Sequence, residues 1–191
     1  MWVFTPSSIA MLDPTLLFAT ASPRFLRTLK YMTRHTISVL VENKFGVLAR
    51  IAGMFSGRGY NIHTLNVGPS HDPSISRMTL VVREKENVLD QIIKQLDKLE
   101  DVIEVVDFRE GESVDRELAL VQVETSPENR AEIITLCDIF RARIIDVSAT
   151  RLTIEITGDG GKITKFLDLM EGFNIVDLTR TGKIALARVQ D

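Results

Sequence analysis

The chain has little cysteine, few aromatic residues and no long hydrophobic run. A single cysteine, Cys137, excludes an internal disulfide framework and any metal site built from several thiolates. This usage fits a reducing cytoplasm, where we expect the protein to reside. A membrane helix needs about 20 consecutive apolar residues, so no membrane span is expected. Ile133, Leu136 and Phe140 share one helical stripe with Cys137, which predicts a buried, unreactive thiol.

Positive charge is not in excess either. The formal net charge is -3 at pH 7, whereas a protein that binds nucleic acid needs a basic face for the phosphates. RNA-recognition modules stack bases on aromatic residues of their central strands, and the predicted strand at residues 76–83 has no aromatic residue. We therefore expect no nucleic-acid partner.

Groups that could form a catalytic or metal centre are also scarce. His35, His63 and His71 lack the i, i+4 helical spacing that brings two metal ligands together. The glycine clusters at residues 57–59 and 158–161 lack the lysine and hydroxyl spacing of a phosphate loop, so we interpret them as a helix end and a turn. The carboxylates between residues 84 and 101 fall on polar helix faces or ends. We predict no metal site and no catalytic residues.

Residues 1–31 differ in character from the rest of the chain. They hold three of the six prolines and a short apolar run at residues 16–19. The triplet Ala19-Thr20-Ala21 resembles a signal-peptidase site, but no positive charge precedes the apolar run. We expect a disordered extension or an upstream start, with the working chain beginning at Met32. A transit peptide containing Arg24, Arg27 and Lys30 is the alternative.

The first half of the working chain, residues 32–109, alternates strand and helix patterns. Strands are predicted at residues 35–42, 61–68, 76–83 and 102–109, and helices at residues 46–58 and 86–100. The order strand-helix-strand-strand-helix-strand is that of the split βαβ, or ferredoxin-like, unit. Both helices then cover one face of a four-stranded sheet.

The same order of elements returns after a polar joint at residues 110–115, which we predict to be the linker. In residues 116–191, strands are predicted at 116–124, 144–148 and 151–158, with closing strands at 174–179 and 184–189, and helices at 127–141 and 161–171. The sequence thus predicts an α+β protein made of two ferredoxin-like (βαββαβ) domains.

The stretch from residue 42 to residue 61 is the strongest candidate for a binding site. A strand there turns through Gly46 into a helix with apolar residues at i, i+3, i+4 and i+7. The first N–H groups of a helix lack intrahelical partners and favour an anion. The amide of Asn43, just upstream, offers both donors and an acceptor. The stretch fits a small amino acid as ligand, although an ordinary βα connector has the same pattern.

Several motifs carry a resemblance to a known family. They are Ser-Val-Leu-Val-Glu-Asn at residues 38–43, Gly-Val-Leu at 46–48, Arg-Gly-Tyr-Asn-Ile at 58–62, Ser-Arg-Met-Thr at 76–79, Lys-Gln-Leu-Asp-Lys-Leu at 94–99, Arg-Glu-Leu-Ala-Leu at 116–120, Phe-Arg-Ala-Arg-Ile-Ile-Asp-Val at 140–147 and Arg-Thr-Gly at 180–182. From Met32 onward the chain resembles the regulatory (small) subunit of acetolactate synthase, also called acetohydroxyacid synthase.

The resemblance implies an N-terminal ACT domain, a ligand-binding variant of the ferredoxin-like unit. In this family two ACT domains pair side by side, and the feedback inhibitor, usually valine, binds at their interface. The family's ligand residues correspond here to Asn43, Gly46, Val47, Leu48, Asn61 and Ile62. Asparagine at position 43 is normal for this family, and Ala49 stands where some relatives have serine.

The resemblance also implies partners and cofactors. It implies a homodimer that associates with a separate catalytic (large) subunit, and it assigns thiamine diphosphate, magnesium and FAD to that subunit, with none in this chain. We therefore expect a non-catalytic, cytoplasmic regulatory subunit that activates acetolactate synthase and confers valine inhibition in branched-chain amino-acid biosynthesis.

Two alternatives belong to other classes. The first is a stand-alone ACT-type amino-acid sensor that controls transcription, which is disfavoured because no helix-turn-helix or basic recognition helix is apparent. The second is a small enzyme on the same fold, which is disfavoured for want of an acid–base constellation.

Overall fold

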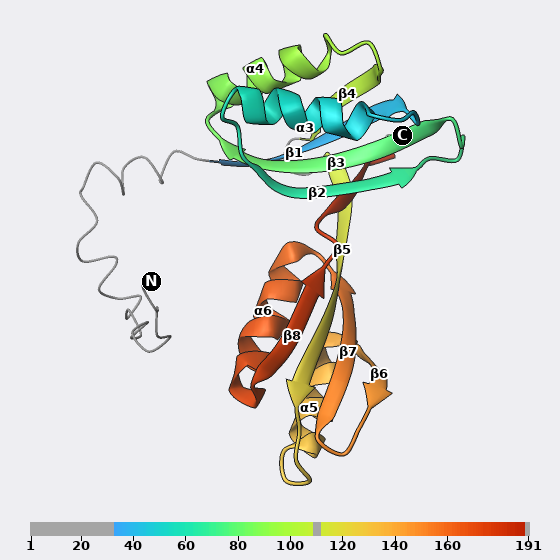
Figure 1. Ribbon diagram of the computed structural model, residues 1–191. Helices are drawn as coiled ribbons and strands as arrows, with labels where there is room; N and C mark the ends of the chain where they lie inside the picture. The colour runs from blue at the N-terminus through green and yellow to red at the C-terminus, as the bar shows by residue number, and fades with distance from the viewer. Residues whose placement is uncertain (1–32, 109–111, 190–191) are drawn as a thin grey trace, which may run out of the picture.

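The computed structural model describes residues 33–108 and 112–189. The predicted extension at residues 1–31 and the first two positions of the predicted linker, 110 and 111, lie outside the described residues. The chain forms two units, each with one sheet and two long helices (Figure 1). The predicted α+β class with two ferredoxin-like domains is confirmed.

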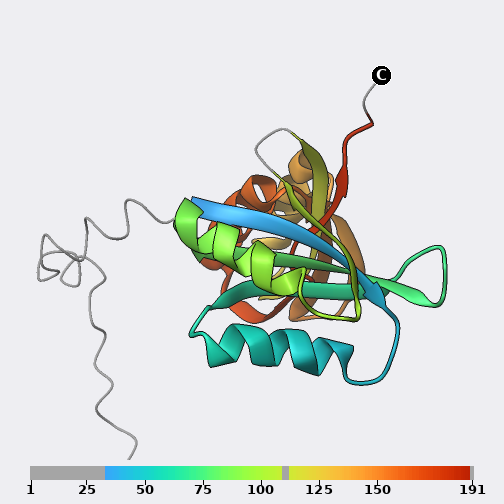
Figure 2. The ribbon, with the colours of Figure 1, turned by 90° about the horizontal axis from the view of Figure 1, so that it is seen from above.

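The N-terminal unit is a four-stranded sheet covered on one face by two helices (Figure 2). Its strands lie in the order β2-β3-β1-β4, and all neighbours are antiparallel. The elements are β1 (Thr33–Glu42), α3 (Val47–Gly57), β2 (Ile62–Pro69), β3 (Ile75–Glu84), α4 (Glu86–Leu96) and β4 (Val102–Phe108).

Alternation along the strands decides which face of this sheet is buried. Ile37, Val39 and Val41 of β1 point toward the helices and are fully buried, because side chains of a strand alternate between faces. The other face carries polar residues such as Ser38, which accepts a hydrogen bond from Arg77 at 2.7 Å. The helix-covered face is therefore the hydrophobic core, and the other face carries polar contacts, although Thr36, Ser38 and Thr79 on it are also buried.

The C-terminal unit repeats this architecture. Its strands lie in the order β6-β7-β5-β8, with α5 and α6 packed on one face around a second core. The elements are β5 (Ser113–Glu124), α5 (Arg130–Phe140), β6 (Arg143–Val147), β7 (Arg151–Gly158), α6 (Gly160–Met170), a short 3-10 turn (Glu171–Phe173), β8 (Ile175–Arg180) and β9 (Ile184–Ala187). Cys137 lies in this core with 2% of its surface exposed, so the predicted buried thiol is confirmed.

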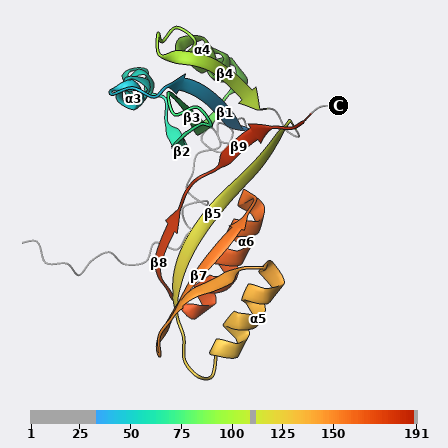
Figure 3. The same cartoon turned by 90° about the vertical axis from the view of Figure 1, so that its right-hand side faces the viewer.

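Strand β5 connects the two units. Its first part, Ser113 to Arg116, pairs with β9, and its second part, from Glu117 onward, pairs with β7. Figure 3 shows β9 beside the upper end of β5, near β1 of the N-terminal sheet. Residues 113–115 of the predicted linker therefore belong to a strand, because β9 supplies a hydrogen-bonding partner there.

Candidate functional site

The Gly46 turn has the geometry that the sequence predicts. Gly46 adopts φ +85°, a left-handed conformation, and immediately precedes α3. The N–H of Leu48, in the first turn of α3, has no hydrogen-bond acceptor within residues 33–108 and 112–189. A free amide at a helix N-terminus is a donor for a carboxylate.

The residues around this turn are held in different ways. The side-chain amide of Asn43 donates to the carbonyl of Pro73 at 2.9 Å, and Asn43 is exposed. Val47 is 3% exposed and packs in the core, so only its backbone is available to a ligand. Leu48 is 44% exposed and Phe45 fully exposed, which leaves apolar surface next to the free amide.

The other two predicted site residues lie far from this turn within one chain. Ile62 is opposite Val82 on β3, whereas Glu42, just before the Gly46 turn, is opposite Ile75. Those two β3 residues are seven positions apart, which corresponds to about 23 Å at the rise of a strand. Asn61 and Ile62 are therefore at the opposite end of the sheet from Gly46. One chain does not bring the six predicted residues together.

The structure also reveals a second concave region that the sequence pattern did not indicate. A cavity of about 650 Å³ lies between β2 of the N-terminal sheet and the N-terminus of α6 with the β8–β9 turn. Arg34, His63, Arg180 and Lys183 are among the charged or ionisable residues that line it. These residues are far apart in the sequence, so no local spacing predicts that they line one cavity.

Two further tests concern metals and membranes. Within residues 33–108 and 112–189, no group of three or more His, Cys, Asp or Glu side chains is arranged to hold a metal ion. In the same part of the chain, no helix combines the length and apolar character needed to cross a membrane.

Comparisons with known proteins match both units. Residues 37–104 match the model of the AHAS small subunit-like ACT domain, and residues 116–189 match that of the small subunit of acetolactate synthase. A probable acetolactate synthase small subunit of Archaeoglobus fulgidus is 52% identical over 155 residues, which cover 81% of this chain and 97% of that one. The acetolactate synthase small subunit of Mycobacterium bovis is 46% identical over 154 residues, which cover 81% and 92%.

A solved structure agrees with these sequences. The crystal structure of the acetolactate synthase small subunit from Thermotoga maritima matches with a TM-score of 0.78 and 37% identity, covering 83% of this chain and 99% of that one. The two family models match one unit each, and the relatives and the solved structure each cover more than four-fifths of the chain. The chain therefore belongs to the acetolactate synthase small-subunit family of regulatory, ACT-domain-containing subunits.

Proposed function

We propose that this chain binds a branched-chain amino acid, most simply valine, between the ACT domains of two copies, and thereby regulates a separate acetolactate synthase catalytic subunit. It raises the activity of that subunit and confers feedback inhibition in branched-chain amino-acid biosynthesis. Thiamine diphosphate, magnesium and FAD belong to the catalytic subunit in this proposal, and the complex works in the cytoplasm.

The observation that carries the proposal is the separation of the predicted ligand residues. Asn43, Gly46 and Leu48 surround the N-terminus of α3, whereas Asn61 and Ile62 follow its C-terminus. A two-fold axis beside α3 and perpendicular to it makes the helices of two copies antiparallel. The N-terminus of one helix then lies next to the C-terminus of the other, and each pair of half-sites becomes one complete site.

The outward surface of α3 supports such a pairing. Four small residues, Ala49, Ala52, Gly53 and Ser56, are exposed on it, and they fall on one face at helical spacing. Small residues let two helix backbones approach closely. Strand β2 is an edge of the sheet, and an edge strand has unpaired backbone groups that can extend a sheet into a second copy.

The chemistry of the half-sites fits valine. The free N–H of Leu48 and the α3 dipole favour its carboxylate, and the amide oxygen of Asn43 can accept from its ammonium. The exposed side chain of Leu48 and the half-buried Ile62 offer an apolar wall for the isopropyl group. Because valine would contact both copies, it can bind one arrangement of the paired ACT domains more tightly than another and so shift the equilibrium between them. Such coupling typically changes the affinity at a second site by about 5- to 150-fold.

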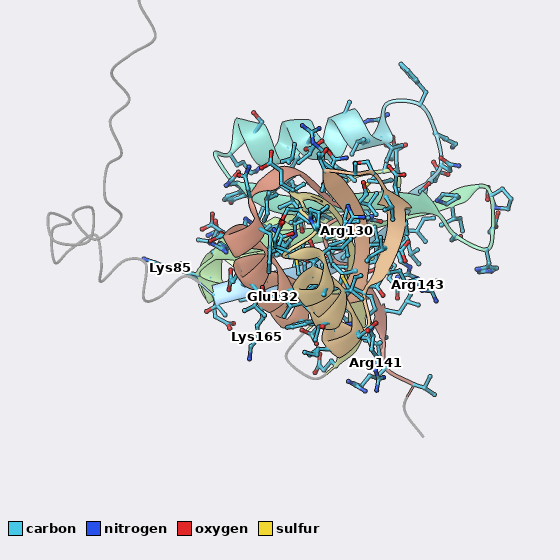
Figure 4. All side chains as sticks on the ribbon, turned by 90° about the horizontal axis from the view of Figure 1, so that it is seen from below. Lys85, Arg130, Glu132, Arg141, Arg143 and Lys165 are labelled. Carbon is cyan, nitrogen blue, oxygen red and sulfur yellow. The ribbon has the colours of Figure 1, made fainter. Side chains whose placement is uncertain are left out.

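The surface that meets the catalytic subunit is proposed to include residues 140–147. Phe140 itself packs edge-to-face on Phe166, with ring centroids 5.3 Å apart, and so supports the C-terminal core. The strand after it, β6, is a sheet edge with Ile145 and Val147 more than half exposed. Figure 4 labels Arg141 and Arg143, at the start of this edge, in a view from below.

The test is a charge substitution at the turn. Gly46→Asp places a carboxylate where the ligand carboxylate is expected, so valine inhibition of the reconstituted enzyme is expected to be lost while activation persists. Gly46→Asn is the matched control, because its side chain has nearly the same size and equal tolerance of positive φ, without the charge. It is expected to retain more sensitivity to valine than the aspartate variant.

Titration of the purified chain with valine, leucine and isoleucine by calorimetry identifies the effector. Asn43→Ala is expected to weaken the binding of the preferred amino acid. Full valine inhibition in Gly46→Asp would contradict the proposed site, and failure of all three amino acids to bind would contradict the proposed effector class.

A further inference from the structure

The cavity between the two units is lined by Arg34, an arginine that forms no ion pair among the described residues. Arg34 of β1 lies directly opposite Arg83 of β3 in the antiparallel ladder, so both side chains start on the same face of the sheet. Like charges in directly opposed positions destabilise a sheet. Neither guanidinium has a carboxylate within salt-bridge distance among residues 33–108 and 112–189.

The nearest partner of Arg34 is a histidine, not an acid. Its Nη2 lies 2.6 Å from Nε2 of His63. A guanidinium can only donate, so Nε2 of His63 accepts and the ring is neutral. Desolvation lowers the pKa of His63, and the positive charges of Arg83, Arg34 and Arg180 lower it further. Three arginines from three different strands therefore act on one histidine.

The acidic residues of the cavity are already engaged. Glu117, which is 8% exposed, accepts two hydrogen bonds from Arg180 at 2.7 and 2.9 Å. Asp115 pairs with Lys183 at 3.2 Å. Asp159 caps α6 by accepting from the backbone N–H of Lys162 at 2.8 Å. Neither Arg34 nor Arg83 forms a direct ion pair among the described residues, although the charge of Glu117 acts on Arg34.

The cavity also offers polar and apolar surface beyond these charges. Thr64 lines it, and the hydroxyl oxygen of this residue is inaccessible to solvent and has no hydrogen-bond partner within the described part of the chain. Gly160, at the N-terminus of α6, lies across from it in the C-terminal unit, and Leu65 and Val81 also line the space. The site thus has donors from both units and room for an organic group.

We propose that this cavity is a second ligand site, which binds the phosphate group of inorganic phosphate or of a small phosphate monoester. A dianion between the two units satisfies the guanidinium of Arg34 by the paired hydrogen bonds that arginine forms with phosphate. It also removes the repulsion between Arg34 and Arg83. Because Lys183 and the start of α6 contact it from the other side, the ligand holds the two units in one relative position.

This inference does not depend on the valine site at the Gly46 turn. The Gly46 half of the valine site follows the end of β1, whereas Arg34 is at its start. The Asn61 and Ile62 half lies at the Arg34 end, directly before His63, but none of the six predicted valine-site residues lines the cavity. Loss of one is expected to leave the other intact.

The experiment compares potassium phosphate with potassium chloride at equal ionic strength, using the full chain. Calorimetry is expected to detect phosphate binding, and thermal denaturation is expected to give a higher Tm in phosphate. Glucose 6-phosphate as a second probe distinguishes a monoester from inorganic phosphate, since tighter binding of the ester indicates that the organic part is also recognised. Arg34→Gln is expected to weaken binding by about 10- to 100-fold.

Two controls separate the site from general charge effects. Arg58→Gln changes an exposed arginine at the C-terminal end of α3, which hydrogen-bonds Gln95 of α4 and does not line the cavity. This variant is expected to bind phosphate as the unchanged chain does. Arg83→Gln is expected to raise the Tm in chloride by removing the repulsion, and to lower the gain that phosphate gives. If Arg83 only supported the fold, its replacement would lower the Tm in both salts, so a higher Tm in chloride with a smaller gain from phosphate is specific to the proposed site.

Nuclear magnetic resonance gives a readout that does not depend on stability. A bound dianion is expected to raise the pKa of His63, measured from its ring protons in phosphate and in chloride. The charged groups facing this histidine are Arg34 of β1, Arg83 of β3, Asp115 and Glu117 of β5, Asp159 before α6, Arg180 of β8 and Lys183.

An equal gain in Tm for the unchanged chain, Arg34→Gln and Arg58→Gln would overturn the proposal, as would an unchanged pKa of His63. If phosphate does not bind and Arg34→Gln instead weakens association with the catalytic subunit, the proposal is also overturned, because the counter-ion is then an acidic side chain of that subunit.

Discussion

Cys137 shows how one residue's setting fixes its chemistry. Desolvation in the C-terminal core, and then the nearby charge of Asp138, raise the pKa of this thiol to about 11 from an ordinary value of 9.0. The thiolate is the reactive form. We expect Cys137 to react with iodoacetamide at pH 8 far more slowly in the native protein than after unfolding in urea, as measured by mass spectrometry.

The same shift makes stability depend on pH. The folded pKa is above the unfolded one, so the contribution is complete below about pH 9 and is lost as the pH rises to about 11. The expected loss at pH 11 is about 2 kcal/mol. Cys137→Ala serves as the control, since it should remove this part of the pH dependence. Equal slopes in the two proteins would contradict the assignment.

At this scale the sequence predicts positions that depend on neighbours along the chain. The turn at Gly46 and the buried stripe with Cys137 follow from local spacing, and both are present. The opposition of Arg34 and Arg83 depends on strand register, which joins segments far apart in the sequence. This pair of arginines could therefore not be predicted from the sequence, because neither segment contains a pattern that shows the two residues to be neighbours.

At the scale of elements, the exposed face of helix α3 is predicted to be the contact between two copies of the chain. Ala52→Glu introduces a longer, charged side chain on the exposed small-residue face. Two copies of this charge would approach each other across the two-fold axis, so the variant is expected to be monomeric at concentrations where the unchanged chain is dimeric. Sedimentation velocity measures the difference, and valine binding should weaken with it.

The control for this variant is Asn87→Glu, which adds the same charge on α4 in the same unit, at a position that is also exposed. It should leave the dimer intact. A dimer of undiminished stability in Ala52→Glu would rule out the face of α3 as the contact.

Element order was predictable, whereas element ends were less so. Helix α4 ends at Leu96 rather than at residue 100, because a turn between Leu96 and Leu99 leads directly into β4. Strand β5 begins at Ser113, inside a segment whose polar, glycine-containing composition favours a linker. Its partner β9 lies at the other end of the unit's sequence, so local composition could not reveal the pairing.

At the scale of the whole molecule, the exposed edge strand β6 of the C-terminal unit is predicted to contact the catalytic subunit. Ile145 is 51% and Val147 59% exposed on β6. The double variant Ile145→Asp, Val147→Asp is expected to weaken association with the catalytic subunit, and so to lower activation at limiting concentration, because buried interface centres are depleted of charge. Surface plasmon resonance measures the affinity, and an activity assay measures the activation.

Ile103→Asp provides a matched control for that variant, since Ile103 is 52% exposed on β4 of the other unit. It should activate normally. Unchanged affinity in the β6 variant would exclude this edge from the contact.

The position of the β8–β9 turn has a consequence for the order in which the protein forms during synthesis. All strands of the N-terminal sheet lie before residue 109, so this sheet has its complete set of partners while the rest of the chain is still being translated. The residues that close the cavity from below, from Arg180 to Lys183, leave the ribosome after all strands of the N-terminal sheet. Domains generally fold in the order of synthesis. The face with Arg34 and Arg83 therefore forms before the segment that completes the junction between the two units.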